Sequence, residues 1–163
     1  MQRLSIVIVT MNSRAFLPAC LTSVFDQQLP MAFDVVVVDN ASTDGSPEYV
    51  QQSFPTIRLI VNKTNVGFSA ANNQGIRGSS GDLLLLLNPD TKLEQNALAT
   101  LTAFVLSGQD LAIAGPKILN ADGTLQRTGV SFPSLWNIAV ESVFLDMIFP
   151  RSRLFGRHRR LYE

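Results

Sequence analysis

The sequence predicts an α/β fold in which a mainly parallel sheet carries helices on both faces. Short runs of β-branched residues or leucine recur along the chain, as is typical of strands that are buried on both faces. Segments with apolar residues at helical spacing separate these runs. Strands that alternate with helices in this way favour parallel layering.

The first half of the chain predicts two strands and two helices. Residues 4–9 and 35–38 have the β-branched composition of strands. Asn12 or Ser13 can cap a helix that runs to about residue 27. A second helix is expected to start at Ser46-Pro47-Glu48, because Ser can cap and Pro fits the first turn. The inward-facing residues of the first helix are predicted to be Phe16, Leu17, Cys20, Leu21, Val24 and Phe25.

The second half continues the alternation as far as residue 114. Residues 57–61 are predicted to form a third strand, and residues 69–76 a helix. The five leucines of 83–87 read as a fourth strand buried on both faces. A helix over 94–106 and a fifth strand over 111–114 complete the predicted alternation of strands and helices.

The fourth predicted strand runs directly into Asn88-Pro89-Asp90. Proline has no backbone N–H for a sheet and favours an extended conformation in the residue before it. The strand should therefore stop here and place Asp90 just past its carboxyl end, where a carboxylate is a candidate for a functional site.

Beyond residue 116 the alternation ends. Residues 120–123 (Asn-Ala-Asp-Gly) predict a tight turn between two short strands at 117–119 and 124–126. We divide the chain into a core domain, 1–130, and a segment, 131–163, with an amphipathic helix and a basic tail. One helix face carries Trp136, Val140, Val143, Phe144 and Met147. This face either packs against protein or lies on a membrane surface.

Composition and charge narrow the class of protein. With 46% hydrophobic and 16% charged residues, the chain is globular and does not resemble a protein that coats nucleic acid. The net charge of zero combines an acidic body with a basic tail, since residues 151–163 hold five of the thirteen basic residues. Cys20 is the single cysteine, and we find neither a signal peptide nor a membrane span. We expect a cytoplasmic protein, with the inner face of the membrane as an alternative location.

Polar residues collect after each of the first four predicted strands. In open parallel sheets, ligands bind outside the carboxyl ends of the strands. Asp39 and Asp90 would both face this edge, amid several asparagines, and the chain has no His before position 158. Carboxylate and amide oxygens suit a hard cation such as Mg²⁺ or Mn²⁺.

Several familiar signatures are missing from the sequence. The glycines at 75, 78 and 81 precede a strand and do not form a dinucleotide fingerprint, and no phosphate-binding P-loop is found. A phosphate-bearing ligand would thus be held mainly through a metal ion. A nucleotidyltransferase is expected to have a glycine-rich loop with a basic residue after the first strand. A phospho-receiver domain is expected to have acidic residues there. Thr10-Met11-Asn12-Ser13 provides neither.

Five ordered blocks carry a resemblance to a known family. The blocks at 5–12, 36–46, 65–75 and 87–90 resemble, in order, those of the inverting GT-A glycosyltransferases of family 2, and 120–126 extends the match. The Asn-Pro-Asp version of the fourth block is similar to the rhamnosyltransferase-like members. The resemblance implies a Rossmann-like GT-A core over 1–130 and a role in cell-wall or polysaccharide biosynthesis.

The resemblance also implies a donor and the residues that bind it. The donor would be a nucleoside-diphosphate sugar of the dTDP-rhamnose or UDP-sugar type, with Mg²⁺ or Mn²⁺ held by Asp90. Asp39 would accept a hydrogen bond from the base, and Met11 stands where an aromatic residue is common. The implied donor-binding residues are Thr10, Met11, Asn12, Asp39, Asn40, Asn65, Gly67, Asn72 and Asn88.

Inverting transfer to a glycan or lipid-linked acceptor also needs a general base. In this family that carboxylate lies in a later block, and Glu141 and Asp146 are too early to match it. We therefore expect the chain to be the donor-binding part of a longer enzyme. The alternative is a non-catalytic module that binds a nucleotide sugar. We expect no nucleic-acid partner, and we consider peripheral membrane contact through residues 135–163.

Overall fold

The computed structural model describes residues 2–108, 111–126, 134–149, 152 and 154–155. The chain forms two compact units, Met1–Ala114 and Gly115–Glu163, which are described separately. The domain boundary predicted at residue 130 lies outside the described residues. Residues 157–159 of the tail, two arginines and His158, also lie outside them.

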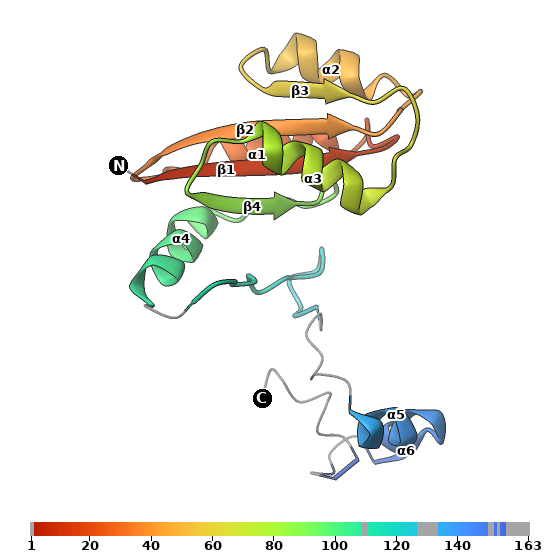
Figure 1. Ribbon diagram of the computed structural model, residues 1–163. Coiled ribbons are helices and arrows are strands. Elements are labelled where there is room, and N and C mark those ends of the chain that lie inside the picture. The colour runs from red at the N-terminus through yellow and green to blue at the C-terminus, as the bar shows by residue number, and fades with distance from the viewer. Residues whose placement is uncertain (1, 109–110, 127–133, 150–151, 153, 156–163) are drawn as a thin grey trace. The chain divides into compact units, whose positions relative to one another are not determined.

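A four-stranded parallel sheet forms the centre of the first unit (Figure 1). Its order is β3-β2-β1-β4, and all three pairings are parallel. This confirms the predicted parallel sheet and four of the five predicted strands. Their bounds are Arg3–Thr10 for β1, Ala32–Asp39 for β2, Arg58–Val61 for β3 and Leu83–Leu87 for β4.

The register brings the carboxyl ends of the strands to one edge. Thr10 at the end of β1 pairs with Asp39 at the end of β2, and Asp39 pairs with Val61 at the end of β3. On the other side of β1, Ile8 pairs with Leu87. Because β2 and β4 lie on opposite sides of β1, the strand order reverses at β1, which is where open α/β sheets bind ligands.

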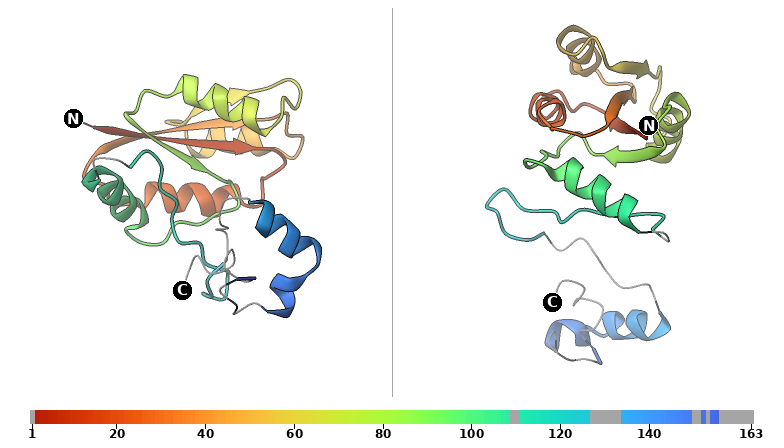
Figure 2. Two further views of the ribbon diagram at one scale, coloured as in Figure 1. Left: turned by 60° about the horizontal axis from the view of Figure 1, so that its bottom comes forward. Right: turned by 90° about the vertical axis from the view of Figure 1, so that its left-hand side faces the viewer.

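Helices cover both faces of the sheet, as predicted (Figure 2). Residues of α1, α2 and α4 share one apolar cluster with the sheet, whereas Ala71 of α3 packs with Val36 and Val38 on the opposite face. The helix bounds are Leu17–Phe25 for α1, Ser46–Ser53 for α2, Phe68–Gly78 for α3 and Ala97–Ser107 for α4.

Gly75 allows α3 to approach the sheet closely. A β-carbon built at this position would overlap Cγ1 of Val7 in β1 and would lie 3.3 Å from Cγ2 of Val38 in β2. The absence of a side chain at residue 75 therefore sets the separation between α3 and the sheet.

The starts of two helices differ from those predicted: the helix after β1 starts later, and the helix after β2 starts one residue earlier. The helix after β1 begins at Leu17, with Pro18 in its first turn, and Ser13 accepts the N–H groups of Phe16 and Leu17 through its carbonyl. The helix after β2 has Gly45 at its N-cap, with φ of 83°, and the predicted cap, Ser46, is its first residue. Proline fixes φ at a helical value, which explains why both starts adjoin a proline.

The prediction that the fourth strand is buried on both faces is wrong. Leu84 and Leu86 of β4 are 47% and 53% exposed. Leu86 pairs with Val7 of β1, which lies on the sheet face that α3 covers. However, α3 packs over β1 and β2 rather than over β4. The outer part of this sheet face is therefore left uncovered in the described structure.

The fifth strand predicted over 111–114 is also wrong. These residues form neither a helix nor a strand, and Ile113 is 90% exposed. These four residues contain one β-branched side chain, Ile113, and a strand also needs a partner strand for its backbone donors and acceptors.

The second unit contains the predicted turn and two short helices. Gly123 donates to the carbonyl of Asn120, and a β-bridge joins Leu119 to Leu125, which confirms the turn. The single amphipathic helix predicted within the segment 131–163 is instead divided, among the described residues, into α5 (Leu135–Ser142) and α6 (Leu145–Ile148). The break occurs at Phe144, which adopts a left-handed φ of 58°. No helix among the described residues is long and apolar enough to cross a membrane.

Candidate functional site

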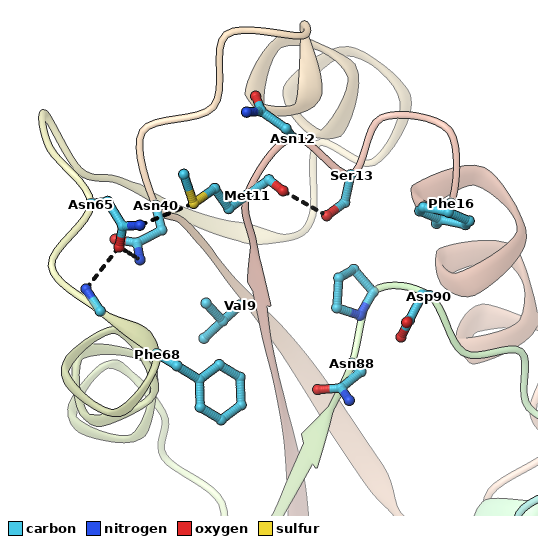
Figure 3. Close-up of a pocket in the computed structure, with 12 residues that line it drawn as sticks. Val9, Met11, Asn12, Ser13, Phe16, Asn40, Asn65, Phe68, Asn88 and Asp90 are labelled. Atoms are coloured by element: carbon cyan, nitrogen blue, oxygen red, sulfur yellow. Dashed lines mark hydrogen bonds between the residues drawn. The ribbon is translucent and has the colours of Figure 1, made fainter.

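A cavity of about 470 Å³ lies at the carboxyl edge of the sheet, across the end of β1 (Figure 3). Its size is within the range of small-molecule sites. Residues after all four strands contribute to it, as the parallel register requires. The predicted site residues that line it are Met11, Asn12, Asn40, Asn65, Gly67, Asn88 and Asp90.

Asn40 fixes one wall of this cavity. Its amide group donates to Oδ1 of Asn65 at 2.6 Å, and its Oδ1 accepts the N–H of Val66 at 3.0 Å and the amide of Asn62 at 3.3 Å. The side chain is buried, so these hydrogen bonds are shielded from water. The buried amide of Asn40 thus ties the loop after β3 to the end of β2.

Met11 and Asn65 lie beside each other on the same wall (Figure 3). The amide of Asn65 contacts Sδ of Met11 at 3.1 Å, and its Oδ1 accepts the N–H of Gly67 at 2.8 Å. Met11 is half exposed. A polarisable thioether therefore takes the place at which the family pattern has an aromatic ring.

The loops after β1 and β2 bind each other through hydrogen bonds from backbone N–H groups to side-chain oxygens. Asn12 donates its N–H to Oγ of Ser42 at 2.8 Å and accepts the N–H of Thr43 at 2.9 Å. Arg14 donates its N–H to Asp44 at 2.8 Å. Desolvation opposes ionisation of Asp44, but hydrogen bonds from Ser46 and Arg14 outweigh it and hold the pKa of this carboxyl below its usual range. The two loops thus form one hydrogen-bonded rim.

Three predicted site residues do not line the cavity. Asn72 is buried and donates its amide to the carbonyl of Phe68 within α3. Thr10 and Asp39 are fully buried at adjacent strand ends. Asp39 accepts the N–H of Ser42 through Oδ2 at 2.9 Å, while its Oδ1 and Oγ1 of Thr10 have no hydrogen-bond partner in the described structure. Their roles in donor binding remain predictions.

Five lining residues were not predicted to belong to the site: Val9, Ser13, Phe16, Phe68 and Pro89. Phe16 was expected in the core, but it is 54% exposed because it precedes the first turn of α1. Phe68 is the first residue of α3 and is 62% exposed. No local sequence pattern identifies either residue, because their exposure depends on where α1 and α3 begin.

Asp90 supplies the carboxylate of the cavity lining, next to the amide of Asn88 (Figure 3). The described residues contain no group of three or more His, Cys, Asp or Glu side chains arranged to hold a metal. Carboxylate and amide oxygens nevertheless suit Mg²⁺ or Mn²⁺, which commonly bind through one or two carboxylates together with substrate phosphates. The residues present therefore fit a divalent ion whose coordination the ligand completes.

A second cavity, of about 690 Å³, lies near the amino ends of β1 and β2 and includes Arg3 and Met31. Arg3 is already paired there with Asp34, at 2.8 Å. This cavity is larger, but it lies at the edge where parallel α/β sheets do not bind ligands. We therefore assign the functional site to the first cavity.

The chain is similar to known glycosyltransferases. A glycosyltransferase of PGL/p-HBAD biosynthesis from Mycobacterium bovis is 38% identical over 158 residues, which cover 93% of this chain and 60% of that protein. An N-acetylglucosaminyl-diphospho-decaprenol L-rhamnosyltransferase from Mycobacterium tuberculosis is 28% identical over 129 residues, covering 72% of this chain and 42% of that protein.

A solved structure shares the fold. The mannosyltransferase PcManGT from Pyrobaculum calidifontis, in complex with GDP-Man and Mn²⁺, has a TM-score of 0.58 and 25% identity, covering 64% of this chain and 32% of that chain. This supports the predicted Rossmann-like GT-A type of fold. The model of the family described as Glycosyl transferase family 2 matches residues 5–157. The chain therefore belongs to glycosyltransferase family 2.

Proposed function

We propose that this chain is the donor-binding part of an inverting glycosyltransferase. The donor is a nucleoside-diphosphate sugar, of the dTDP-rhamnose or UDP-sugar type, and the acceptor is a glycan or a lipid-linked glycan. The observation that carries the proposal is the cavity at the strand-order reversal, which has amide groups on one wall and Asp90 on the other. Residues 1–130 form the nucleotide-sugar-binding core in this proposal.

The nucleoside binds on the side of Asn40, Asn65 and Met11. Asp39 has a free acceptor, Oδ1, that a base N–H could satisfy, and a buried carboxylate oxygen without a donor is unfavourable. Because Asp39 is fully buried, a base reaches it only if neighbouring residues move.

The diphosphate binds on the side of Asn88 and Asp90. These two side chains would hold Mg²⁺ or Mn²⁺, and the ion when bound offsets the negative charge that develops on the leaving diphosphate. Phe16 and Pro89 add apolar surface to the cavity lining beside them.

Proton removal from the acceptor is assigned to a residue beyond the described site. The side chains of Glu141 and Asp146 lie outside the described residues. The chain spans 60% of the length of the mycobacterial relative, and we propose that another part of a longer enzyme supplies the general base.

The second unit contacts the cytoplasmic face of a membrane in this proposal. The relative from Mycobacterium tuberculosis is named for a decaprenol-linked substrate. In α5 and α6, Ile138, Met147 and Ile148 are each more than half exposed, and the sequence places five arginines in residues 151–163. Anionic lipid attracts such basic segments. Stronger binding to anionic than to neutral vesicles is expected, and equal binding to both or to neither would contradict it.

Titration calorimetry with UDP, dTDP and UDP-sugars, with and without Mn²⁺, tests the donor site. Binding that tightens with Mn²⁺ supports the proposal, and no binding to any of these ligands contradicts it. The alternative is a non-catalytic nucleotide-sugar-binding module, which is favoured by the presence of a single carboxylate in the described cavity lining. Sugar transfer to a lipid-linked acceptor by the full-length enzyme would exclude that alternative.

A further inference from the structure

Three buried groups that can form hydrogen bonds lie on α1 and just past its end. Cys20 and Ser23 are in the helix, and Gln27 follows its C-cap, Asp26, and donates to the carbonyl of Ser23 at 3.2 Å. The adjacent apolar residues Leu21 and Val24 pack in the core. Buried polar groups of this kind are retained when they have hydrogen-bond partners.

Their partners lie in the segment that follows β4. Sγ of Cys20 donates to the carbonyl of Asn88 at 3.7 Å. Oγ of Ser23 accepts the N–H of Leu93 at 3.0 Å. Gln27 donates to the carbonyl of residue 94 at 3.0 Å and accepts the N–H of residue 98 at 3.2 Å. Two side chains of α1 and one just past its end therefore bind the backbone of residues 88–98.

Residues 88–96 form neither a helix nor a strand, so their backbone groups have no partners within a regular element. Side chains or water must satisfy such groups, and the side chains of Cys20, Ser23 and Gln27 do so here. Asp90 lies between the contact of Cys20 with Asn88 and the contact of Ser23 with Leu93. The backbone on both sides of the proposed metal ligand is thus held by α1.

The turn that leads into α1 contacts the loop after β2. Ser13 donates its N–H to Oγ of Ser46 at 3.2 Å, and Arg14 donates its N–H to Asp44 at 2.8 Å. Ser13 and Phe16 also line the cavity. The helix and its leading turn therefore contact both the hydrogen-bonded rim of the loops after β1 and β2 and the segment that carries Asp90.

We propose that Cys20, Ser23 and Gln27 are positioning residues that fix Asp90 relative to the nucleoside side of the cavity. The inference rests on the proposed function, because it assigns these residues to the metal and diphosphate half of that site. They act through the backbone of 88–98 and touch neither the ion nor the nucleotide. Removing one of them should weaken metal-dependent binding and leave metal-independent binding unchanged.

Ser23→Ala and Gln27→Leu in the whole chain test this inference by calorimetry with UDP and dTDP. Loss of a partner that orients a metal ligand typically costs 10- to 100-fold in affinity, so we expect about a tenfold weaker nucleotide affinity in Mn²⁺. Without Mn²⁺ the affinity should change less than about twofold. Amide hydrogen exchange at Leu93 should accelerate in Ser23→Ala, because its acceptor is removed.

Ser5→Ala is a matched control. The hydroxyl of Ser5 is also buried, accepts a backbone N–H from Gly81 at 2.8 Å and donates to Asp34 at 2.9 Å. It lies toward the amino end of β1, away from the cavity. This variant should lose a similar amount of thermal stability and keep the full effect of Mn²⁺ on nucleotide affinity.

The outcomes separate the inference from the proposed function. A wild-type chain whose nucleotide affinity does not respond to Mn²⁺ contradicts the donor site itself, and this inference with it. A wild-type response that survives unchanged in Ser23→Ala overturns the inference alone. If Gln27→Leu fails to fold, the inference is tested by Ser23→Ala alone, which removes only a hydroxyl group. An equal loss of Mn²⁺ response in Ser5→Ala would show a general loss of stability and would also overturn the inference.

Discussion

Replacing Asp90 with asparagine removes the carboxylate charge from the cavity and keeps the shape of the side chain. Asp90 is exposed, so the interaction with a divalent ion is best estimated in the solvated limit. At about 4 Å in water, two unit charges attract by roughly 1 kcal/mol, and a divalent ion doubles this to about 2 kcal/mol. That energy corresponds to roughly a 30-fold loss of nucleotide affinity in Mn²⁺.

Calorimetric titration of Asp90→Asn with UDP and dTDP, in Mn²⁺ and in chelator, measures this loss. The affinity in chelator should match that of the wild type, and the free energy of unfolding should change by less than about 0.5 kcal/mol, as for other exposed sites. Asp26→Asn, at the exposed end of α1, is the charge-matched control. Unchanged affinity of Asp90→Asn in Mn²⁺ would refute the assignment of Asp90 as the metal ligand.

Three further predictions concern the base, the packing of α3 and the buried thiol. Asp39→Asn should weaken nucleotide binding to a similar extent with and without Mn²⁺ in calorimetry; a loss confined to Mn²⁺ would argue against base recognition. Gly75→Ala should lower the free energy of unfolding by about 1–3 kcal/mol in denaturant titrations, because the added methyl group overlaps Val7. Gly115→Ala is the control, because Gly115 has open space around it and the free energy of unfolding should not fall. Burial raises the pKa of the Cys20 thiol from 9.0 to about 11. The folded state then holds a proton that the unfolded state releases, so stability should fall between pH 9 and 11, and Cys20→Ala should flatten that decline.

The interior of the sheet could be predicted from the sequence, but its boundary could not. The valines of 35–38 are buried on both faces because β2 lies between β1 and β3 and under α3. The leucines of 83–87 have the same apolar composition, yet α3 does not cover them. Which helix lies over which strand depends on long-range packing, such as the contact of Gly75 with Val7, and no local pattern contains that information.

The residues of the site also divide into some that could be predicted from the sequence and others that could not. Asn40 and Asn88 could be predicted because the carboxyl ends of parallel strands meet at one edge. Phe16 and Phe68 could not, because their exposure depends on where α1 and α3 begin. The hydrogen bond from the backbone of Leu93 to Ser23 joins residues 70 positions apart, a pairing that sequence spacing does not predict.

The position of β4 also has a consequence for the behaviour of the protein in solution. Among the described strands, β4 pairs with β1 alone, and Leu84 and Leu86 are half exposed beside its open backbone edge. An open apolar edge is a template for strand pairing between molecules. Concentrated solutions of this chain should therefore aggregate through β4, and Leu84→Lys should keep the protein dispersed, as measured by light scattering.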